Sequence, residues 1–583
     1  MKELRFLNQF FIKYKWRLLL GLIITVVATM FRIIVPAKIG DSVDAVQSSF
    51  NGEITREALK AVLLENILLI LGAALLSAFF TFLMRQTIIV VSRNIEFDLK
   101  NVVFEQYEKL SLSFYKLNRT GDLMSRISED ISKVRMYAGP ALMYSTTTIT
   151  LFIVAISYMA YSAPLLTLYA VAPLPILSIT IYRLSIAIHK RSTVVQQYLS
   201  KLTTFTQESF SGISVIKAYG IEGRTQIDFE KLADGSKEKN IDLTKVQALF
   251  FPLMILLIGA SNLLVVYVGG NQYIEGKIDF GTIVEFLIYV NMLTWPVAIV
   301  GWVSSMVQQA EASQKRINEF LKEQPEIINT ATTRTNVIGK IEFKNVSFTY
   351  PDTHITALKE VSFFVSPGET LAIIGNTGSG KSTILELITR LYDVEQGSYT
   401  VDDIAAKDID LEDLRNSIGY VPQDAFLFSD TISNNIKFGR KDATDDDVII
   451  AAKNAALHRN IEGFSKGYET ILGERGITLS GGQKQRVSIA RAIIKNPKIL
   501  LLDDCLSAVD TETEEEILQN LGLVSENKTT LIVSHRVSSV KNADKIIVLE
   551  DGVIIQQGSH NQLINSDGYY KNLYHKQLLE KEM

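Results

Sequence analysis

Two adjacent carboxylates, Asp503 and Asp504, follow a short apolar run in the segment KILLLDDCLSAVD at 498–510. One interpretation is a solvated pair at the end of a buried strand. The other is a site that holds Mg²⁺ and activates water beside a bound phosphate chain. The second interpretation requires a phosphate-binding segment elsewhere in the chain.

A glycine-rich segment at 370–388 provides such a loop. In TLAIIGNTGSGKSTILELI an apolar run enters the pattern G-x-x-x-x-G-K-S and a helix pattern leaves it, which is the setting of a P-loop. Backbone N–H groups of such a loop wrap phosphates, and the helix N-terminus adds the positive end of its dipole. The predicted ATP-binding residues here are Gly375, Asn376, Thr377, Gly378, Ser379, Gly380, Lys381, Ser382 and Thr383.

Three side chains of these two segments have complementary chemistry. Lys381 offers a cation to the β- and γ-phosphates, and the hydroxyl of Ser382 offers an oxygen to Mg²⁺. The carboxylate of Asp503 would emerge beside them and hold the same ion. The alternative, a glycine-rich turn that carries Lys-Ser by chance, is disfavoured by the flanking strand and helix patterns. ATP and Mg²⁺ are therefore the predicted cofactors.

The segments before residue 311 are of a different kind. The chain has 583 residues, too many for one core, and 47% of them are hydrophobic, with a mean hydropathy of +0.17. A bilayer core of about 30 Å takes roughly 20 helical residues to cross. Six apolar stretches reach that length, near 17–46, 61–91, 138–161, 164–187, 247–270 and 281–310. We predict an α-helical membrane domain at 1–310, with six transmembrane helices and long cytoplasmic extensions.

Lys and Arg are unevenly distributed between these stretches. They are frequent at 85–135 and 183–245 and scarce at 47–60, 162–163 and 271–280. By the positive-inside rule the rich segments are cytoplasmic, and so are both termini. Because the first stretch lacks a small-residue cleavage site, we expect it to be retained as a span.

Polar residues interrupt the apolar stretches at a few positions. A charge at mid-bilayer costs about 3 kcal/mol or more, so Arg32 should face protein or a water-filled cavity. A structural role, through snorkelling or a salt bridge with Glu285, is the alternative, and both interpretations stay open. The candidate cavity residues are Arg32, Asn262, Glu285 and Asn291.

The composition becomes polar from about residue 311. Residues 311–340 predict a linker, alternating strand and helix patterns at 341–575 predict an α/β P-loop NTPase domain, and 576–583 form a C-terminal tail. The formal net charge of −4 gives no indication of a nucleic-acid partner. Cys505 is the single cysteine, which excludes an intrachain disulfide and a zinc site built on several cysteines.

The segment LSGGQKQRVSIARA, which begins at Leu479, resembles the signature motif of ATP-binding cassette (ABC) proteins. Other motifs of that family stand in order around it. Tyr350 resembles the aromatic residue that stacks on adenine, Gln423 the Q-loop glutamine, and His535 the switch histidine. The resemblance implies that Gln423 joins Ser382 and Asp503 at Mg²⁺. It also implies catalytic roles for Asp504, His535, Gln423 and Lys381.

The resemblance extends into the membrane half. Segments 114–134 and 207–224 are similar to the two cytoplasmic loops of six-helix ABC exporters. The chain as a whole therefore resembles an ABC half-transporter, a multi-pass protein of the bacterial inner (plasma) membrane. In that family each ATP lies between one P-loop and the signature of a second domain, so a second half-transporter is the expected partner. The residues offered to the partner's ATP are Leu479, Ser480, Gly481, Gly482, Gln483 and Asp510.

Asp504 departs from the family pattern, in which a glutamate usually follows the Mg²⁺-holding aspartate. The loss of one methylene withdraws the carboxylate by roughly 1.5 Å, and a misplacement of about 1 Å can cost on the order of a hundredfold in rate. We expect this chain's own site to bind ATP well and to hydrolyse it slowly. A heterodimer with a competent partner is favoured, and a slow homodimer stays open.

Three functions are consistent with these motifs. The first is ATP-driven export of amphipathic small molecules, drugs or lipids through a cavity that contacts membrane lipids. The second is a regulatory ATP-binding subunit that gates a transporter or channel with little hydrolysis of its own. The third is import through an exporter-like fold, which the sequence does not separate from export.

Overall fold

The chain divides into two compact units, and each unit is made of two separate segments of sequence. In this computed structural model the first unit is 1–107 with 121–322, and the second is 108–120 with 323–583. The structure describes residues 2–331, 333–473, 476, 479–507 and 509–582. Each unit has its own hydrophobic core.

The first unit is helical and contains six long apolar segments among the described residues, which confirms the predicted spans. Each has 36 to 54 residues, well beyond the roughly 20 that cross a bilayer, so the helices continue outside it as expected. The segments are Lys15–Phe50, Arg56–Lys109, Thr120–Ser162, Pro164–Ser211, Glu222–Ile274 and Phe280–Leu321. The last one continues past residue 310, where the sequence suggested the start of a linker.

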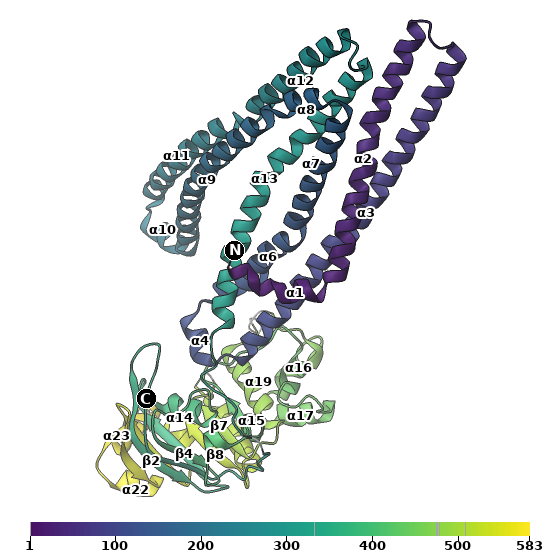
Figure 1. The fold of residues 1–583 in the computed structure, drawn as a ribbon. Coiled ribbons are helices and arrows are strands. Elements are labelled where there is room, and N and C mark those ends of the chain that lie inside the picture. The colour runs from purple at the N-terminus through teal and green to yellow at the C-terminus, as the bar shows by residue number, and fades with distance from the viewer. Residues whose placement is uncertain (1, 332, 474–475, 477–478, 508, 583) are drawn as a thin grey trace. The chain divides into compact units, whose positions relative to one another are not determined.

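Some spans are single helices and others are broken. The unbroken ones are α2 (Lys15–Phe50), α3 (Arg56–Lys109) and α13 (Phe280–Leu321). The third span is divided by π-helical turns, in the order α5 (Thr120–Ser125), η2 (Arg126–Asp130), α6 (Ile131–Met136), η3 (Tyr137–Ala141) and α7 (Leu142–Ser162). The others comprise α8 (Pro164–Val171), α9 (Pro173–Ser211), α10 (Ile213–Tyr219), α11 (Glu222–Gln247) and α12 (Phe250–Ile274). In Figure 1, α9 and α11 run side by side and α10 joins them.

A buried carboxylate ties α13 to the third span. Asp130 is 1% exposed, accepts a hydrogen bond from Ser313 at 2.8 Å, and lies 3.3 Å from the guanidinium of Arg316. Arg316 also pairs with Asp122 at 2.7 Å. Since an unpaired buried charge is strongly destabilising, this network fixes the register of α13 against η2 and α5. The short helices η1 (Glu3–Leu7) and α1 (Asn8–Lys13) precede the first span in this unit.

The second unit confirms the predicted α/β domain. Its larger sheet has the order β10-β9-β3-β8-β7-β6, in which all pairs are parallel except β10 with β9. These strands are β3 (Thr370–Gly375), β6 (Ile418–Val421), β7 (Ile499–Asp503), β8 (Thr529–Val533), β9 (Lys545–Glu550) and β10 (Val553–Gly558). An antiparallel sheet of β2 (Thr356–Val365), β1 (Ile341–Thr349), β4 (Gln396–Val401) and β5 (Ile404–Ala405) accompanies it.

Two hydrophobic clusters hold this unit together. One joins the antiparallel sheet to the parallel sheet and includes Phe343, Phe363 and Leu371, the two phenylalanine rings being stacked at 4.6 Å. The other packs helices around β7 and includes Leu500 and Leu502.

The helices of the second unit are α4 (Leu112–Leu117), α14 (Lys381–Ile388), α15 (Leu411–Ser417), α16 (Ile432–Lys437), α17 (Asp445–Asn454), α18 (His458–Glu462), α19 (Gly481–Ile493), α20 (Thr511–Val524), α21 (Val537–Val540), α22 (His560–Asn565) and α23 (Tyr569–Glu582), with the turns η4 (Ala406–Asp408) and η5 (Gly467–Glu469).

The complete burial of β7 makes a stability prediction. Leu501 is 0% exposed in this strand, so Leu501→Ala should destabilise the domain by about 2–5 kcal/mol, through lost burial and a cavity. Leu523→Ala is the matched control, because Leu523 is 76% exposed and should change stability by about 0.5 kcal/mol or less. Denaturation of the purified full-length chain in detergent measures both. Equal effects of the two changes would contradict the assigned core.

Candidate functional site

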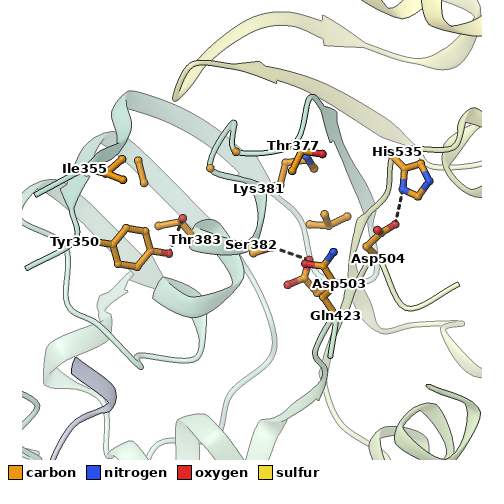
Figure 2. Close-up of a pocket in the computed structure, with 14 residues that line it drawn as sticks. Tyr350, Ile355, Thr377, Lys381, Ser382, Thr383, Gln423, Asp503, Asp504 and His535 are labelled. Atoms are coloured by element: carbon orange, nitrogen blue, oxygen red, sulfur yellow. Dashed lines mark hydrogen bonds and ion pairs between the residues drawn. The ribbon is translucent and has the colours of Figure 1, made fainter. Parts of the chain in front are cut away.

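A pocket of about 360 Å³ lies where the P-loop and the two aspartates meet (Figure 2). The sheet register explains the meeting. Val533 of β8 pairs with Ile373 of β3 on one side and with Asp503 of β7 on the other, and in parallel strands the carboxyl ends share one edge. The lining residues are Tyr350, Ile355, Ala357, Thr377, Gly378, Gly380, Lys381, Ser382, Thr383, Gln423, Asp503, Asp504, Val533 and His535.

The loop between β3 and α14 depends on glycine at its last position. Gly380 has φ +97°, a conformation that residues with a side chain rarely adopt, and it stands at the N-cap of α14. A Cβ on Gly380 would lie 2.3 Å from the carbonyl oxygen of Ala357. The first α14 residue, Lys381, is thereby placed at the pocket, and backbone N–H groups at this helix start stay available to an anion.

Lys381 folds back over the loop. Its ammonium group donates to the carbonyl oxygens of Gly375 at 2.9 Å and Asn376 at 2.7 Å. Burial lowers the pKa of Lys381, and the charges of Asp504 and Asp503 oppose that shift. The ammonium therefore lies in a partly desolvated site with two carboxylates in electrostatic reach, where a phosphate chain would replace its carbonyl partners.

Ser382 and Asp503 are in direct contact. The Ser382 hydroxyl donates to the Asp503 carboxylate at 3.0 Å, the contact drawn in Figure 2. Asp503 is 3% exposed, and this burial raises its pKa to about 6, against the hydrogen bond from Ser382. Two hard oxygen atoms are thus held side by side in a pocket that also contains Gln423, a set suited to a hard divalent cation.

Asp504 points away from Ser382 toward a different partner. It has φ +42°, and its backbone N–H donates to the carbonyl of Val533 at 2.9 Å. Its carboxylate lies 2.9 Å from Nδ1 of His535, as Figure 2 shows. The two aspartates therefore have separate surroundings, which explains how neighbouring carboxylates can serve different purposes.

Tyr350 forms the far wall of the pocket with Ile355. Its hydroxyl donates to Glu386 at 2.8 Å and lies 2.9 Å from the hydroxyl of Thr383, and burial raises its pKa. Lys116 of α4 lies over the Tyr350 ring at 4.8 Å from its centroid. Glu386, Ile355 and Lys116 were missed by the sequence analysis, because no motif marks them. Lys116 is far from Tyr350 along the chain.

The signature residues lie elsewhere on the same unit. Ser480 caps α19 and forms a capping box with Gln483, with hydrogen bonds of 3.0 and 3.3 Å. Asp510 caps α20 through the backbone N–H of Thr513 at 2.9 Å. Among the described residues that line the pocket, none belongs to 479–483, and Asp510 is also outside it. The structure does not bring the P-loop and the signature of this chain together.

The candidate cavity residues in the membrane-spanning unit have different surroundings. Arg32 lines a pocket in the first unit with residues of α3 and α13. Glu285 is 6% exposed, and within the described chain no ion pair joins it to Arg32. Asn262 has a buried side-chain oxygen without a hydrogen-bond partner, and Asn291 donates to the carbonyl of Leu287 at 2.7 Å. Of these four residues, only Arg32 lines that pocket.

A P-loop α/β domain fused to a bundle of six apolar helices defines a class, the membrane transport ATPases. Residues 18–297 match the family described as "ABC transporter transmembrane region", and 358–507 match "ABC transporter". The two families therefore occur in one chain, in the order that the sequence resemblance indicated.

Whole-length relatives agree with these family matches. The chain is 34% identical to "Multidrug resistance-like ATP-binding protein MdlA" of Escherichia coli, over 98% of this chain and 96% of that protein. It is 34% identical to the "ATP-dependent lipid A-core flippase" of Syntrophus aciditrophicus, over 85% and 82%. A solved bacterial Atm1-family ABC exporter with ATP bound has a TM-score of 0.80 and 27% identity, covering 96% of this chain and 99% of that one.

The chain belongs to the ABC transporter family. It is a half-transporter, with one membrane domain and one ATP-binding domain, and an ATPase coupled to transport. It is a multi-pass membrane protein whose exporter fold implies a dimer.

The raised pKa of Asp503 makes a pH-dependent prediction. Because the folded-state pKa is about 6 and the ordinary value is 3.8, the folded chain binds more protons than the unfolded chain between these values. Stability should therefore fall as pH rises through that window, by up to about 3 kcal/mol for two pKa units. Asp503→Asn should remove this loss.

Thermal unfolding of the nucleotide-free and Mg²⁺-free chain in detergent, between pH 4.5 and 8, tests it. The Asn variant should be the more stable protein at pH 8, and its advantage should shrink as the pH falls toward 4.5. Asp446→Asn, at an exposed carboxylate of α17, is the matched control and should give a difference without this pH trend. Parallel profiles of wild type and Asp503→Asn would contradict the assigned burial.

Proposed function

We propose that this chain exports amphipathic small molecules, drugs or lipids from the cytoplasmic side of the bacterial inner membrane, as half of a dimeric transporter with both termini in the cytoplasm. The P-loop pocket with its Ser382–Asp503 contact, on the same chain as six apolar spans, is the observation that carries the proposal. Relatives named for multidrug resistance and multidrug export, and one named as a flippase, support this direction and class of substrate.

In this proposal the pocket holds ATP with Mg²⁺. The ring of Tyr350 stacks on adenine, the loop from Gly375 to Thr383 wraps the phosphates, and Lys381 neutralises them. Ser382, Asp503 and Gln423 hold Mg²⁺. The described chain has no cluster of three or more His, Cys, Asp or Glu side chains for a metal, so ATP phosphate oxygens and water would complete the coordination of Mg²⁺.

A transport assay tests the export proposal. Inverted membrane vesicles that contain the chain should accumulate a fluorescent amphipathic dye when ATP is added outside. Lys381→Ala should abolish accumulation, because it removes the cation from the phosphate site, whereas Lys344→Ala, at an exposed lysine of β1, should leave it unchanged. Tight ATP binding without accumulation or substrate-stimulated turnover would instead support the regulatory function. Accumulation in right-side-out vesicles would support import.

Two features support the need for a partner chain. Ser480 and Asp510 lie outside the chain's own ATP pocket, so their family roles require a second nucleotide-binding domain. The segment around α10 also exposes large apolar side chains, with Phe210 71%, Val215 55% and Tyr219 78% exposed. Such an exposed cluster is typical of a surface that another chain covers.

We further propose that the two ATP sites of the dimer are unequal. The Asp504 carboxylate is one methylene shorter than a glutamate and is already in contact with His535 at 2.9 Å. A general base must come within hydrogen-bond reach of the attacking water, so this carboxylate is badly placed for that role. The partner would then supply the faster site, through a glutamate at the matching position, which favours a heterodimer.

The unequal-site proposal predicts a gain of function. In the chain purified alone, Asp504→Glu should raise the ATPase rate on the order of a hundredfold, because it extends the carboxylate toward the water. Asp504→Asn should remove the residual rate, and Asp446→Glu, outside the pocket lining, should change nothing. The measurement is phosphate release at saturating ATP and Mg²⁺. A wild-type rate equal to that of Asp504→Glu would contradict the slow site and favour a homodimer.

A further inference from the structure

A second pocket, of about 440 Å³, lies within the membrane-spanning unit, between α2, α3 and α13. Each helix contributes a regular stripe. From α2 come Arg32, Val35 and Pro36, at helical spacings of three and four residues, and from α13 come Ile288 and Met292. The α3 stripe is Ala74, Ser77, Ala78 and Thr81. The volume falls in the range of small-molecule sites, about 300–1,000 Å³.

Arg32 is the charged residue among the described residues of this lining. It is exposed, and it forms no ion pair or hydrogen bond with another described residue. The acidic groups nearest along α2 are engaged elsewhere. Asp41 pairs with Lys38 at 2.6 Å, and Asp44 accepts from the backbone N–H of Gly281 at 2.5 Å. A guanidinium inside an apolar span is costly unless something compensates it, so the charge calls for an anionic partner from outside this chain.

Thr81 adds a second unused donor. Threonines inside helices commonly donate to the carbonyl four residues earlier, as Thr25 does to Gly21 at 2.7 Å and Thr147 does to Met143 at 2.9 Å. Thr81 makes no such bond within the described structure. Ser77 donates to the carbonyl of Ala28 at 3.1 Å, so it is already committed. The pocket therefore presents one cation and one free hydroxyl among apolar walls.

We propose that this pocket binds an anionic amphiphile. Arg32 and Thr81 would hold its phosphate or carboxylate headgroup, while Val35, Ile288 and Met292 contact the tail. A guanidinium fork matches the geometry of both anions and stays charged in a protein. The proposal deepens the proposed export function and rests on it, since it names anionic amphiphiles as the substrate class.

A binding measurement without ATP tests the pocket separately from transport. The full-length chain in nanodiscs of zwitterionic lipid is titrated with fluorescent alkyl phosphate, alkyl phosphocholine and alkyl trimethylammonium probes of equal chain length. The alkyl phosphate should bind tightest. Arg32→Gln should weaken it by about tenfold or more, as expected for the loss of a charged hydrogen bond, and Arg32→Lys should weaken it less.

Arg17→Gln is the matched control, because Arg17 is an exposed arginine of the same helix outside the pocket, and it should leave affinity unchanged. An unchanged thermal unfolding midpoint and size-exclusion profile of the full-length chain show that each variant is folded. Equal binding of the three probes, or an alkyl phosphate affinity insensitive to Arg32→Gln, would overturn the proposal. So would displacement by inorganic phosphate as effective as by unlabelled alkyl phosphate, since a free anion would then suffice.

Loss of dimer on Arg32→Gln with unchanged probe affinity would also overturn the proposal, because Arg32 would then pair with a partner's carboxylate.

The anion-binding proposal and the export proposal can be contradicted independently. Anion binding without ATP-driven accumulation of any amphiphile would remove the export function and keep the site. Dye export that is unaffected by Arg32→Gln, in a chain that binds no alkyl phosphate, would remove the site and keep the export function.

Discussion

The parallel pairing of β3, β8 and β7 is the constraint on which the ATP site depends. Val533 in the middle strand pairs with Ile373 on one side and Asp503 on the other, so the P-loop and the aspartates leave the sheet at the same edge. Burial of these strands supplies the stability, and it also raises the pKa of Asp503. The same packing stabilises the sheet and desolvates the Asp503 carboxylate, whose charged form a divalent cation would stabilise.

The site so formed is complete for binding nucleotide and incomplete for the family's ATP sandwich. Ser480 and Gln483 form the capping box of a different helix, α19, and residues 479–483 are absent from the described lining of the pocket. In the proposed dimer, backbone N–H groups at the start of α19 would face the nucleotide held by the partner's P-loop. The exporter fold implies a dimer, and the separation of the signature from the pocket is consistent with it. Asp504, held by His535, makes the two sites of that dimer unequal in our proposal.

The membrane-spanning unit contains two charged side chains, Asp130 and Arg32, whose surroundings differ. Asp130 is buried, accepts a hydrogen bond from Ser313 and pairs with Arg316, which fixes α13 against the third span. Arg32 is exposed to a pocket and unengaged by the described chain. The paired charge of Asp130 holds two helices in register, whereas the unpaired charge of Arg32 stays available to bind a ligand.

Much of this protein was predictable from local pattern alone. Span length and apolarity gave the six helices, and G-x-x-x-x-G-K-S with the run before Asp503 gave the ATP site, because both signals depend on residues close in sequence. The π-turns at η2 and η3, the extension of α13 to Leu321, and the contact of Lys116 with Tyr350 were not predictable. They depend on helix packing and on segments far apart in the chain.

Arg32 shows this division most clearly. By itself the sequence determined that a charge stands within the first span, and that it must either pair or face a cavity. The tertiary structure adds that no ion pair joins Arg32 to Glu285 among the described residues, and that Arg32 lines a pocket with Thr81. The physical reason is that helix register decides which side chains lie beside a charge within a span, and hydropathy does not specify register.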